Sequence, residues 1–194
     1  MKLYGKTLML RRGRMLNINL LYECNLKCSY GSLEMPTGIR PKAKRVGLED
    51  WKTFITDFTS KNKIREIYVS GGEPTMVKYL SDLVNWLLNQ GFHVLIFSNL
   101  FNPDRLLQIK QSYRFKVQAT YHSLHDNADR FDAAYKKVIK KHRVDVDEIE
   151  SNVLPYSKSK PFMKIDGLKD KEFRISPDLQ IYNSCIEHYT EKSK

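Results

Sequence analysis

Apolar residues along the chain follow two spacings, one typical of strands and one typical of helices. Residues 15–22 alternate in part and then become apolar, which predicts a strand, and residues 3–10 form a weaker candidate strand before it. Leucine, tryptophan, isoleucine and phenylalanine then fall on one helical face over residues 48–58. A second strand is expected over residues 64–69, where a glycine pair ends it.

The same alternation continues in the second half of the chain. Leucines and a valine at helical spacing predict a helix over residues 80–88 that ends at Gly91. The nearly continuous apolar run over residues 93–97 predicts a parallel strand covered on both faces. Pro103 is expected to open a third helix, which would include Ile109.

Residues 115–121 alternate as a fourth strand, and Asp126 is expected to cap the helix that follows it. A further strand is predicted to start at Val144. Near the C-terminus, residues 173–176 and 180–183 flank a Pro-Asp-Leu turn and predict a hairpin.

This order of elements predicts the fold class. Repeated alternation of strand and helix calls for a parallel sheet with right-handed crossovers, either open or curled into a barrel. We therefore expect an α/β protein of one domain over residues 1–194, with a core over residues 15–150 and a C-terminal extension over residues 151–194.

Composition narrows the class further. The 194 residues suffice for a core without disulfide bonds, and three cysteines do not form a complete set of pairs. No apolar run is long enough to span a membrane, and the N-terminus lacks the apolar core of a signal peptide, so we expect a soluble cytoplasmic protein. The net charge of +11 is compatible with an anionic substrate or partner.

Residues able to carry chemistry follow four of the predicted strands. In a parallel sheet the carboxyl ends of the strands meet at one edge, so these groups are expected to gather there. They are Cys24 and Cys28 after the first strand, Gly71-Gly72-Glu73-Pro74 after the second, Ser98-Asn99 after the third and His122 after the fourth.

Each group has a purely structural alternative. Thiolates four residues apart can bind a soft metal or an iron–sulfur cluster, but cysteine is also among the most buried residue types. The glycine pair allows close approach to a ligand or makes a tight turn. Glu73 either presents a carboxylate to a cationic group or is an ordinary exposed residue at a helix start.

Taken together, the motifs resemble those of radical S-adenosylmethionine (radical SAM) enzymes. The segment Cys24-Asn25-Leu26-Lys27-Cys28-Ser29-Tyr30-Gly31 is similar to their signature loop, which reads Cys, three residues, Cys, one residue, an aromatic residue, Cys. Gly71-Gly72-Glu73-Pro74 and Ser98-Asn99 resemble the motifs that follow the second and third strands. The likeness covers residues 15–125 in order, which makes it more specific than any single motif.

The resemblance implies a partial (β/α)6 barrel, a [4Fe-4S] cluster held by three cysteines, and bound S-adenosylmethionine. Reductive cleavage of that molecule would give a 5′-deoxyadenosyl radical that abstracts hydrogen from a substrate. By motif, Cys24 and Cys28 would be cluster ligands and Tyr30 would lie near the adenine. Gly71, Gly72 and Glu73 would hold the methionine amino group, and Ser98 or Asn99 would face the ribose or the carboxylate. Pro74 and His122 are the other expected cofactor-binding residues.

The chain departs from the family pattern at one position. Gly31 stands where the third cysteine is expected, and glycine has no side chain to bind iron. Three interpretations remain open: a disabled variant of an active enzyme, a non-catalytic binding protein on the same scaffold, or replacement of the ligand. The candidate replacements are Cys185, His122, His125 and Ser32.

Two further interpretations concern other metal sites that the cysteines could form. Cys24, Cys28, His122 and His125 would make a Cys2His2 set suited to zinc, although their separation is unlike a compact zinc module. Cys185 resembles the start of an auxiliary-cluster extension, but no further cysteine follows it.

The expected substrate is a small molecule, a nucleotide or a peptide, and an active enzyme would need an electron donor. Basic residues cluster at 11–14, 40–45, 136–143 and 158–171 without a nucleic-acid-binding motif.

Overall fold

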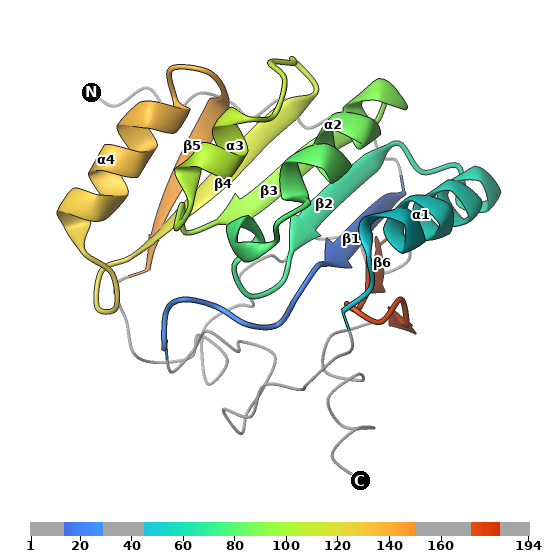
Figure 1. Cartoon of the computed structure of the whole chain (residues 1–194), viewed down its shortest axis with the longest axis horizontal. Coiled ribbons are helices and arrows are strands. Elements are labelled where there is room, and N and C mark those ends of the chain that lie inside the picture. Colours follow the sequence, from blue (N-terminus) through green and yellow to red (C-terminus); the bar gives the residue numbers. More distant parts are fainter. Residues whose placement is uncertain (1–13, 29–44, 150–171, 183–194) are drawn as a thin grey trace, which may run out of the picture.

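A computed structural model describes residues 14–28, 45–149 and 172–182 (Figure 1). In these segments one seven-stranded sheet has the order β5-β4-β3-β2-β1-β6-β7. All neighbouring strands are parallel except β6 and β7, which pair antiparallel. The strands are β1 (Met15–Asn19), β2 (Glu66–Ser70), β3 (His93–Ser98), β4 (Phe115–His122), β5 (Arg143–Ile149), β6 (Glu172–Ile175) and β7 (Ile181–Tyr182).

The helices follow strands in alternation and cover one face of the sheet (Figure 1). This arrangement confirms the predicted α/β class with a parallel sheet, which stays open in the described part of the chain. The helices are α1 (Leu48–Asn62), the short 3-10 helix η1 (Pro74–Met76), α2 (Leu80–Asn89), α3 (Pro103–Leu107) and α4 (Ala128–Val138). None of them is both long and apolar enough to cross a bilayer.

The core lies between the helices and the sheet face that they cover. Alternate strand residues such as Ile67, Val69, Val94 and Ile96 are buried there against leucines of α2. Because strand side chains alternate between faces, their neighbours lie on the opposite face and are only half-buried. Full burial of one such side chain is worth about 1.5–3 kcal/mol, so the many side chains buried at this interface contribute strongly to the stability of the fold.

Several sequence predictions need correction. The strand over residues 93–97 is fully covered on one face and only partly covered on the other, since His93, Leu95 and Phe97 are half-buried. Helix α3 ends at Leu107, two residues before Ile109, which is buried just beyond the helix. The predicted strand over residues 3–10 lies outside the described residues.

The helix after β4 begins differently from the prediction. Asn127, not Asp126, caps α4, and its side chain accepts the Arg130 N–H. The carboxylate of Asp126 is instead paired with the Arg130 side chain.

The predicted C-terminal hairpin is confirmed, and its position adds a feature that the pattern did not reveal. Strand β6 pairs in parallel with β1, with Met15 opposite Glu172 and Ile18 opposite Ile175. Strand β1 therefore lies inside the sheet, between β2 and β6, although it is the first of the described strands along the chain.

Candidate cofactor-binding site

The carboxyl ends of β1, β2, β3 and β4 meet at one edge of the sheet because these strands are parallel. The cysteine loop, the Gly-Gly-Glu-Pro turn, the Ser-Asn pair and His122 therefore all lie at this edge, as their positions along the chain predict. Tyr30, Gly31, Ser32 and Cys185 lie outside the described residues.

The two described cysteines differ in exposure. Cys24 is partly exposed, whereas Cys28 is buried. The Cys24 Sγ atom accepts a hydrogen bond from the Leu26 N–H at 3.4 Å and lies 3.7 Å from the Asn25 Oδ1 atom. Local hydrogen bonds thus shape the loop around Cys24.

The glycine pair packs directly against the chain that leads into this loop. The Gly72 N–H donates to the Leu21 carbonyl at 2.8 Å, and the Glu73 N–H donates to the Glu23 carbonyl at 3.0 Å. A Cβ atom at Gly72 would lie 1.9 Å from the Glu23 carbonyl oxygen, and one at Gly71 would lie 2.2 Å from the Leu21 oxygen. The glycines therefore permit two backbone segments to approach, which places the cysteine loop.

Glu73 is buried beneath this turn, with a relative exposure of 1%. Its Oε1 atom accepts hydrogen bonds from the Thr75 N–H, the Thr75 hydroxyl and the Ser98 hydroxyl at 2.9, 2.5 and 2.7 Å. Its Oε2 atom accepts the Asn99 N–H at 2.7 Å. Burial raises the pKa of this carboxyl, while these donors favour its charged form. Glu73 thus joins the end of β2 to the end of β3, and Pro74 begins η1 beside it.

Ser98 is the last residue of β3 and Asn99 follows it, and their side chains contact different groups. The Ser98 hydroxyl donates to Glu73 and accepts the Leu100 N–H at 2.9 Å. The Asn99 Nδ2 atom donates to the Asn25 Oδ1 atom at 2.9 Å and lies 3.6 Å from the Cys24 Sγ atom. The Asn99 Oδ1 atom is buried and has no hydrogen-bond partner within the segments that the structure describes.

His122 ends β4 beside the second cysteine. Its Nδ1 atom lies 3.7 Å from the Cys28 Sγ atom. Burial lowers the pKa of His122, which favours the neutral ring, and the carboxylate of Asp126 partly opposes this effect. His125 lies in the turn after β4, where its N–H donates to the His122 carbonyl at 2.9 Å.

Three residues that shape this edge were not among the predicted site residues. Asn25 holds the Asn99 amide, and Arg130 with Asp126 holds the backbone that carries Asn99. The spacing of Asp126 and Arg130 could have indicated their ion pair, because an acid is followed four residues later by a base at the start of a helix.

The basic loop before α1 also reaches this edge. The Arg45 Nη2 atom pairs with the Glu23 Oε1 atom at 2.8 Å. Arg45 therefore lies beside the cysteine loop, whereas Arg40, Lys42 and Lys44 lie outside the described residues.

The donor set does not fit a [4Fe-4S] cluster held by three cysteines. Cys24 and Cys28 supply two thiolates, and position 31 supplies none. Within residues 14–28, 45–149 and 172–182, no group of three His, Cys, Asp or Glu side chains is arranged to hold a metal ion. The unpartnered Asn99 oxygen, in contrast, fits a ligand that donates a hydrogen bond.

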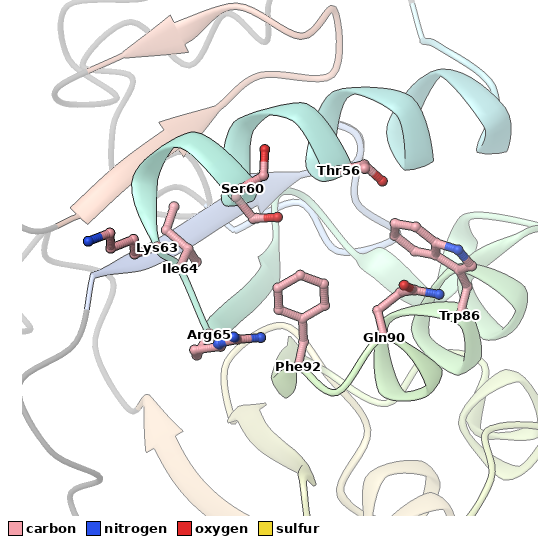
Figure 2. A pocket seen from close by; sticks show the side chains of 9 residues that line it. Thr56, Ser60, Lys63, Ile64, Arg65, Trp86, Gln90 and Phe92 are labelled. Atoms are coloured by element: carbon pink, nitrogen blue, oxygen red, sulfur yellow. The ribbon is translucent and has the colours of Figure 1, made fainter.

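A cavity of about 440 Å³ lies elsewhere, between the second half of α1 and the end of α2 (Figure 2). It is lined by residues that precede β2 and β3, among them Arg65 and Phe92, so it lies at the amino ends of these strands. Lys63 and Arg65 follow the C-terminus of α1, where basic side chains complement the helix dipole. This cavity is therefore separate from the candidate site.

No protein-family profile matches the chain. Two curated relatives do. A protein named as a glycyl-radical enzyme activating enzyme from Methanocaldococcus jannaschii is 29% identical over 80 residues, which cover 41% of this chain and 29% of the relative. A PqqA peptide cyclase from Bradyrhizobium diazoefficiens is 24% identical over 127 residues, which cover 64% of this chain and 32% of the relative. The matches therefore span about a third of these relatives.

Solved structures share the fold at low sequence identity. BtrN in complex with AdoMet and 2-DOIA has a TM-score of 0.62 and 16% identity, covering 92% of this chain and 75% of that chain. SuiB from Streptococcus suis, bound to the precursor peptide SuiA, has a TM-score of 0.56 and 15% identity, covering 93% of this chain and 46% of that chain. Likeness at this level of identity establishes a shared fold.

Proposed function

We propose that this chain, a member of the radical SAM superfamily, binds S-adenosylmethionine at the carboxyl edge of its sheet, and that Gly31 leaves its cluster site one thiolate short. The observation that carries the proposal is the gathering of Cys24, Cys28 and Asn99 at that edge. The chain would then derive from an enzyme whose radical chemistry is impaired in this form.

The Asn99 side chain supports binding of a polar ligand. Its Oδ1 atom is a buried acceptor without a partner in the described residues, and such an atom costs about 1–3 kcal/mol. An amino or hydroxyl group of S-adenosylmethionine would satisfy it. The Asn99 backbone N–H donates to Glu73, and the Asn99 side-chain amide donates to Asn25. Asn99 would therefore already be oriented when the ligand binds.

The relatives suggest the class of substrate. One is named a peptide cyclase, and the SuiB structure contains a precursor peptide, whereas the BtrN structure contains 2-DOIA. We therefore favour a peptide substrate, with a small molecule or a nucleotide as alternatives. The net charge of +11 favours an anionic substrate. If active, the protein would also need an electron donor.

The decisive experiment restores the missing ligand. The chain, Gly31→Cys and Ser32→Cys are reconstituted anaerobically with iron and sulfide, and bound iron, bound sulfide, S-adenosylmethionine affinity and release of 5′-deoxyadenosine are measured. Ser32→Cys is the matched control, because it adds a third thiol to the loop of Cys24 and Cys28 but one position away from the family spacing. We expect about four iron atoms and four sulfides, with cleavage, in Gly31→Cys alone.

Other results would point to other functions. A cluster and cleavage in the unmodified chain would show that another residue replaces the third thiolate, and Cys185 and His122 would be substituted next. Absence of both cluster and S-adenosylmethionine binding in Gly31→Cys would contradict the proposal and favour a non-catalytic binding protein. Stoichiometric zinc without sulfide would favour a zinc-stabilised α/β protein.

A further inference from the structure

Arg130 makes four hydrogen bonds with its side chain at the candidate edge, although it belongs to none of the motifs. It projects from the first turn of α4 toward the turn after β3. Its Nη1 atom donates to the Leu100 carbonyl and its Nη2 atom donates to the Asn99 carbonyl, each at 2.8 Å. One guanidinium therefore holds two successive peptide groups of the segment that carries Asn99.

A second set of contacts joins Arg130 to the turn after β4. Its Nε atom donates to the Asp126 Oδ1 atom at 2.7 Å, and its Nη2 atom is paired with Asp126 Oδ2. The Asp126 carboxylate is nearly buried, with 3% side-chain exposure. The Asp126 N–H in turn donates to the His122 carbonyl at 2.9 Å. An unbroken series of hydrogen bonds thus connects the Asn99 carbonyl to the His122 carbonyl.

The backbone at Leu100 has an unusual conformation that this series of hydrogen bonds helps to maintain. Leu100 has a φ of 59°, in the left-handed region that non-glycine residues seldom adopt. Such a conformation persists only when surrounding contacts enforce it. The Leu100 side chain is fully buried, and Ser98 and Arg130 hold its N–H and carbonyl, so the turn is fixed from three directions.

We propose that Arg130 is a positioning residue that fixes the turn carrying Asn99 and the turn carrying His122 relative to each other. Through it, the Asn99 amide stays beside Cys24 while the His122 ring stays beside Cys28. Arg130 itself touches neither cysteine in any contact that the structure gives. Its effect on ligand affinity rests on the proposed function, whereas its effect on the two turns does not.

The test compares Arg130→Gln and Arg130→Lys with Arg114→Gln. Arg114 is the matched control because its Nη2 atom also donates to a backbone carbonyl, that of Leu88, at the opposite edge of the sheet. Three quantities are measured: amide hydrogen exchange resolved along the chain, the midpoint of thermal unfolding, and S-adenosylmethionine affinity of the reconstituted Gly31→Cys form.

We expect Arg130→Gln to speed exchange about tenfold in both segments 98–102 and 122–127, while the core strands keep their protection. The affinity of the reconstituted Gly31→Cys form for S-adenosylmethionine should fall about tenfold when Arg130→Gln is added. Arg130→Lys should be intermediate, because an ammonium cannot reproduce the planar fork. Arg114→Gln should leave both segments and the affinity unchanged.

Three results would overturn the inference. Faster exchange in segment 98–102 alone would show that the turns are not coupled. Faster exchange throughout the chain, in step with a lower unfolding midpoint, would show a general stabilising role. Unchanged exchange in both segments would show no role in positioning. Local changes in exchange together with no S-adenosylmethionine binding in any form would support the positioning of the turns and count against the proposed function.

Discussion

Gly72 lies so close to the chain before Cys24 that no side chain fits between them. Its hypothetical Cβ atom would meet the Glu23 carbonyl oxygen at 1.9 Å and the carbonyl carbon at 2.3 Å. Backbone atoms cannot rotate away as a flexible side chain can. The identity of this residue therefore controls where the cysteine loop sits, even though the residue offers no functional group.

Substitution of Gly72 by alanine is expected to displace this loop. We expect a loss of about 2–3 kcal/mol in the free energy of unfolding, the upper range for forced overpacking, measured by urea denaturation. Gly47→Ala is the control, since its added Cβ would meet only the Asp50 Oδ2 atom at an ordinary 3.4 Å. A loss at Gly72 no larger than that at Gly47 would mean that the loop adapts without cost.

The positions of the motifs along the sequence predict this site, but they do not predict its hydrogen bonds. Parallel strands bring their carboxyl ends together, so the motif order placed Cys24, Glu73, Asn99 and His122 at one edge. The hydroxyl groups of Thr75 and Ser98 donate hydrogen bonds to Glu73, and the Asn99 amide lies beside Cys24. These contacts depend on side-chain directions that no local sequence pattern encodes. The wrong cap of α4 has the same origin, because the carboxylate of Asp126 pairs with Arg130.

At the scale of elements, His142 links three parts of the fold. It lies just before β5, its Nε2 atom lies 2.9 Å from the carbonyl of Leu106 in α3, and its ring packs edge-on against Phe115 of β4 at 4.8 Å. It is 6% exposed. Burial lowers the pKa of this histidine below its ordinary 6.5, so the folded protein favours the neutral ring.

This histidine should make stability depend on pH. Its folded pKa is depressed, so its contribution is present above pH 6.5, the ordinary value, and is lost as the pH falls from there through the folded pKa, because the unfolded chain binds the proton first. The free energy of unfolding should therefore fall more between pH 7.5 and 5.5 in the natural chain than in His142→Gln. His93→Gln, at a more exposed histidine, should change this difference less. Parallel profiles for the natural chain and His142→Gln would contradict the assignment.

The elements themselves were largely predictable because their apolar spacing is local information. The strands over residues 66–70 and 115–122 and the helix over residues 48–62 appear close to where the pattern indicates. The end of α3 was not predictable, since Ile109 continues the apolar pattern but is buried beyond the helix. The pairing of β6 with β1 was not predictable either, because partners so distant in sequence leave no local signal.

At the scale of the whole molecule, the C-terminal hairpin completes the sheet on the far side of β1. Ile175 and Ser176 are buried, Phe173 packs edge-on against Phe58 of α1 at 5.0 Å, and the Val46 N–H donates to the Pro177 carbonyl at 3.3 Å. The hairpin thus contacts the strand that leads into the cysteine loop and the segment that leads into α1.

Removal of the hairpin should therefore destabilise the whole fold. We expect a chain ending after Lys171 to lose about 3 kcal/mol or more in the free energy of unfolding and to self-associate, since β1 would present an unpaired edge. A chain ending after Asn183 keeps β6 and β7 and is the control. Urea denaturation and light scattering measure the two effects. Equal stability and a monomeric state for both chains would show that β6 is dispensable.

The interior position of β1 also bears on how the protein forms during translation. Met15 leaves the ribosome long before its partner Glu172, which follows it much later along the chain. Until then the nascent chain can complete β1 on the β2 side only, and the other edge stays open to neighbouring nascent chains. Slower elongation between β2 and β6 would prolong that exposure, so the yield of native protein should depend on codon choice there and on chaperones that shield a growing sheet.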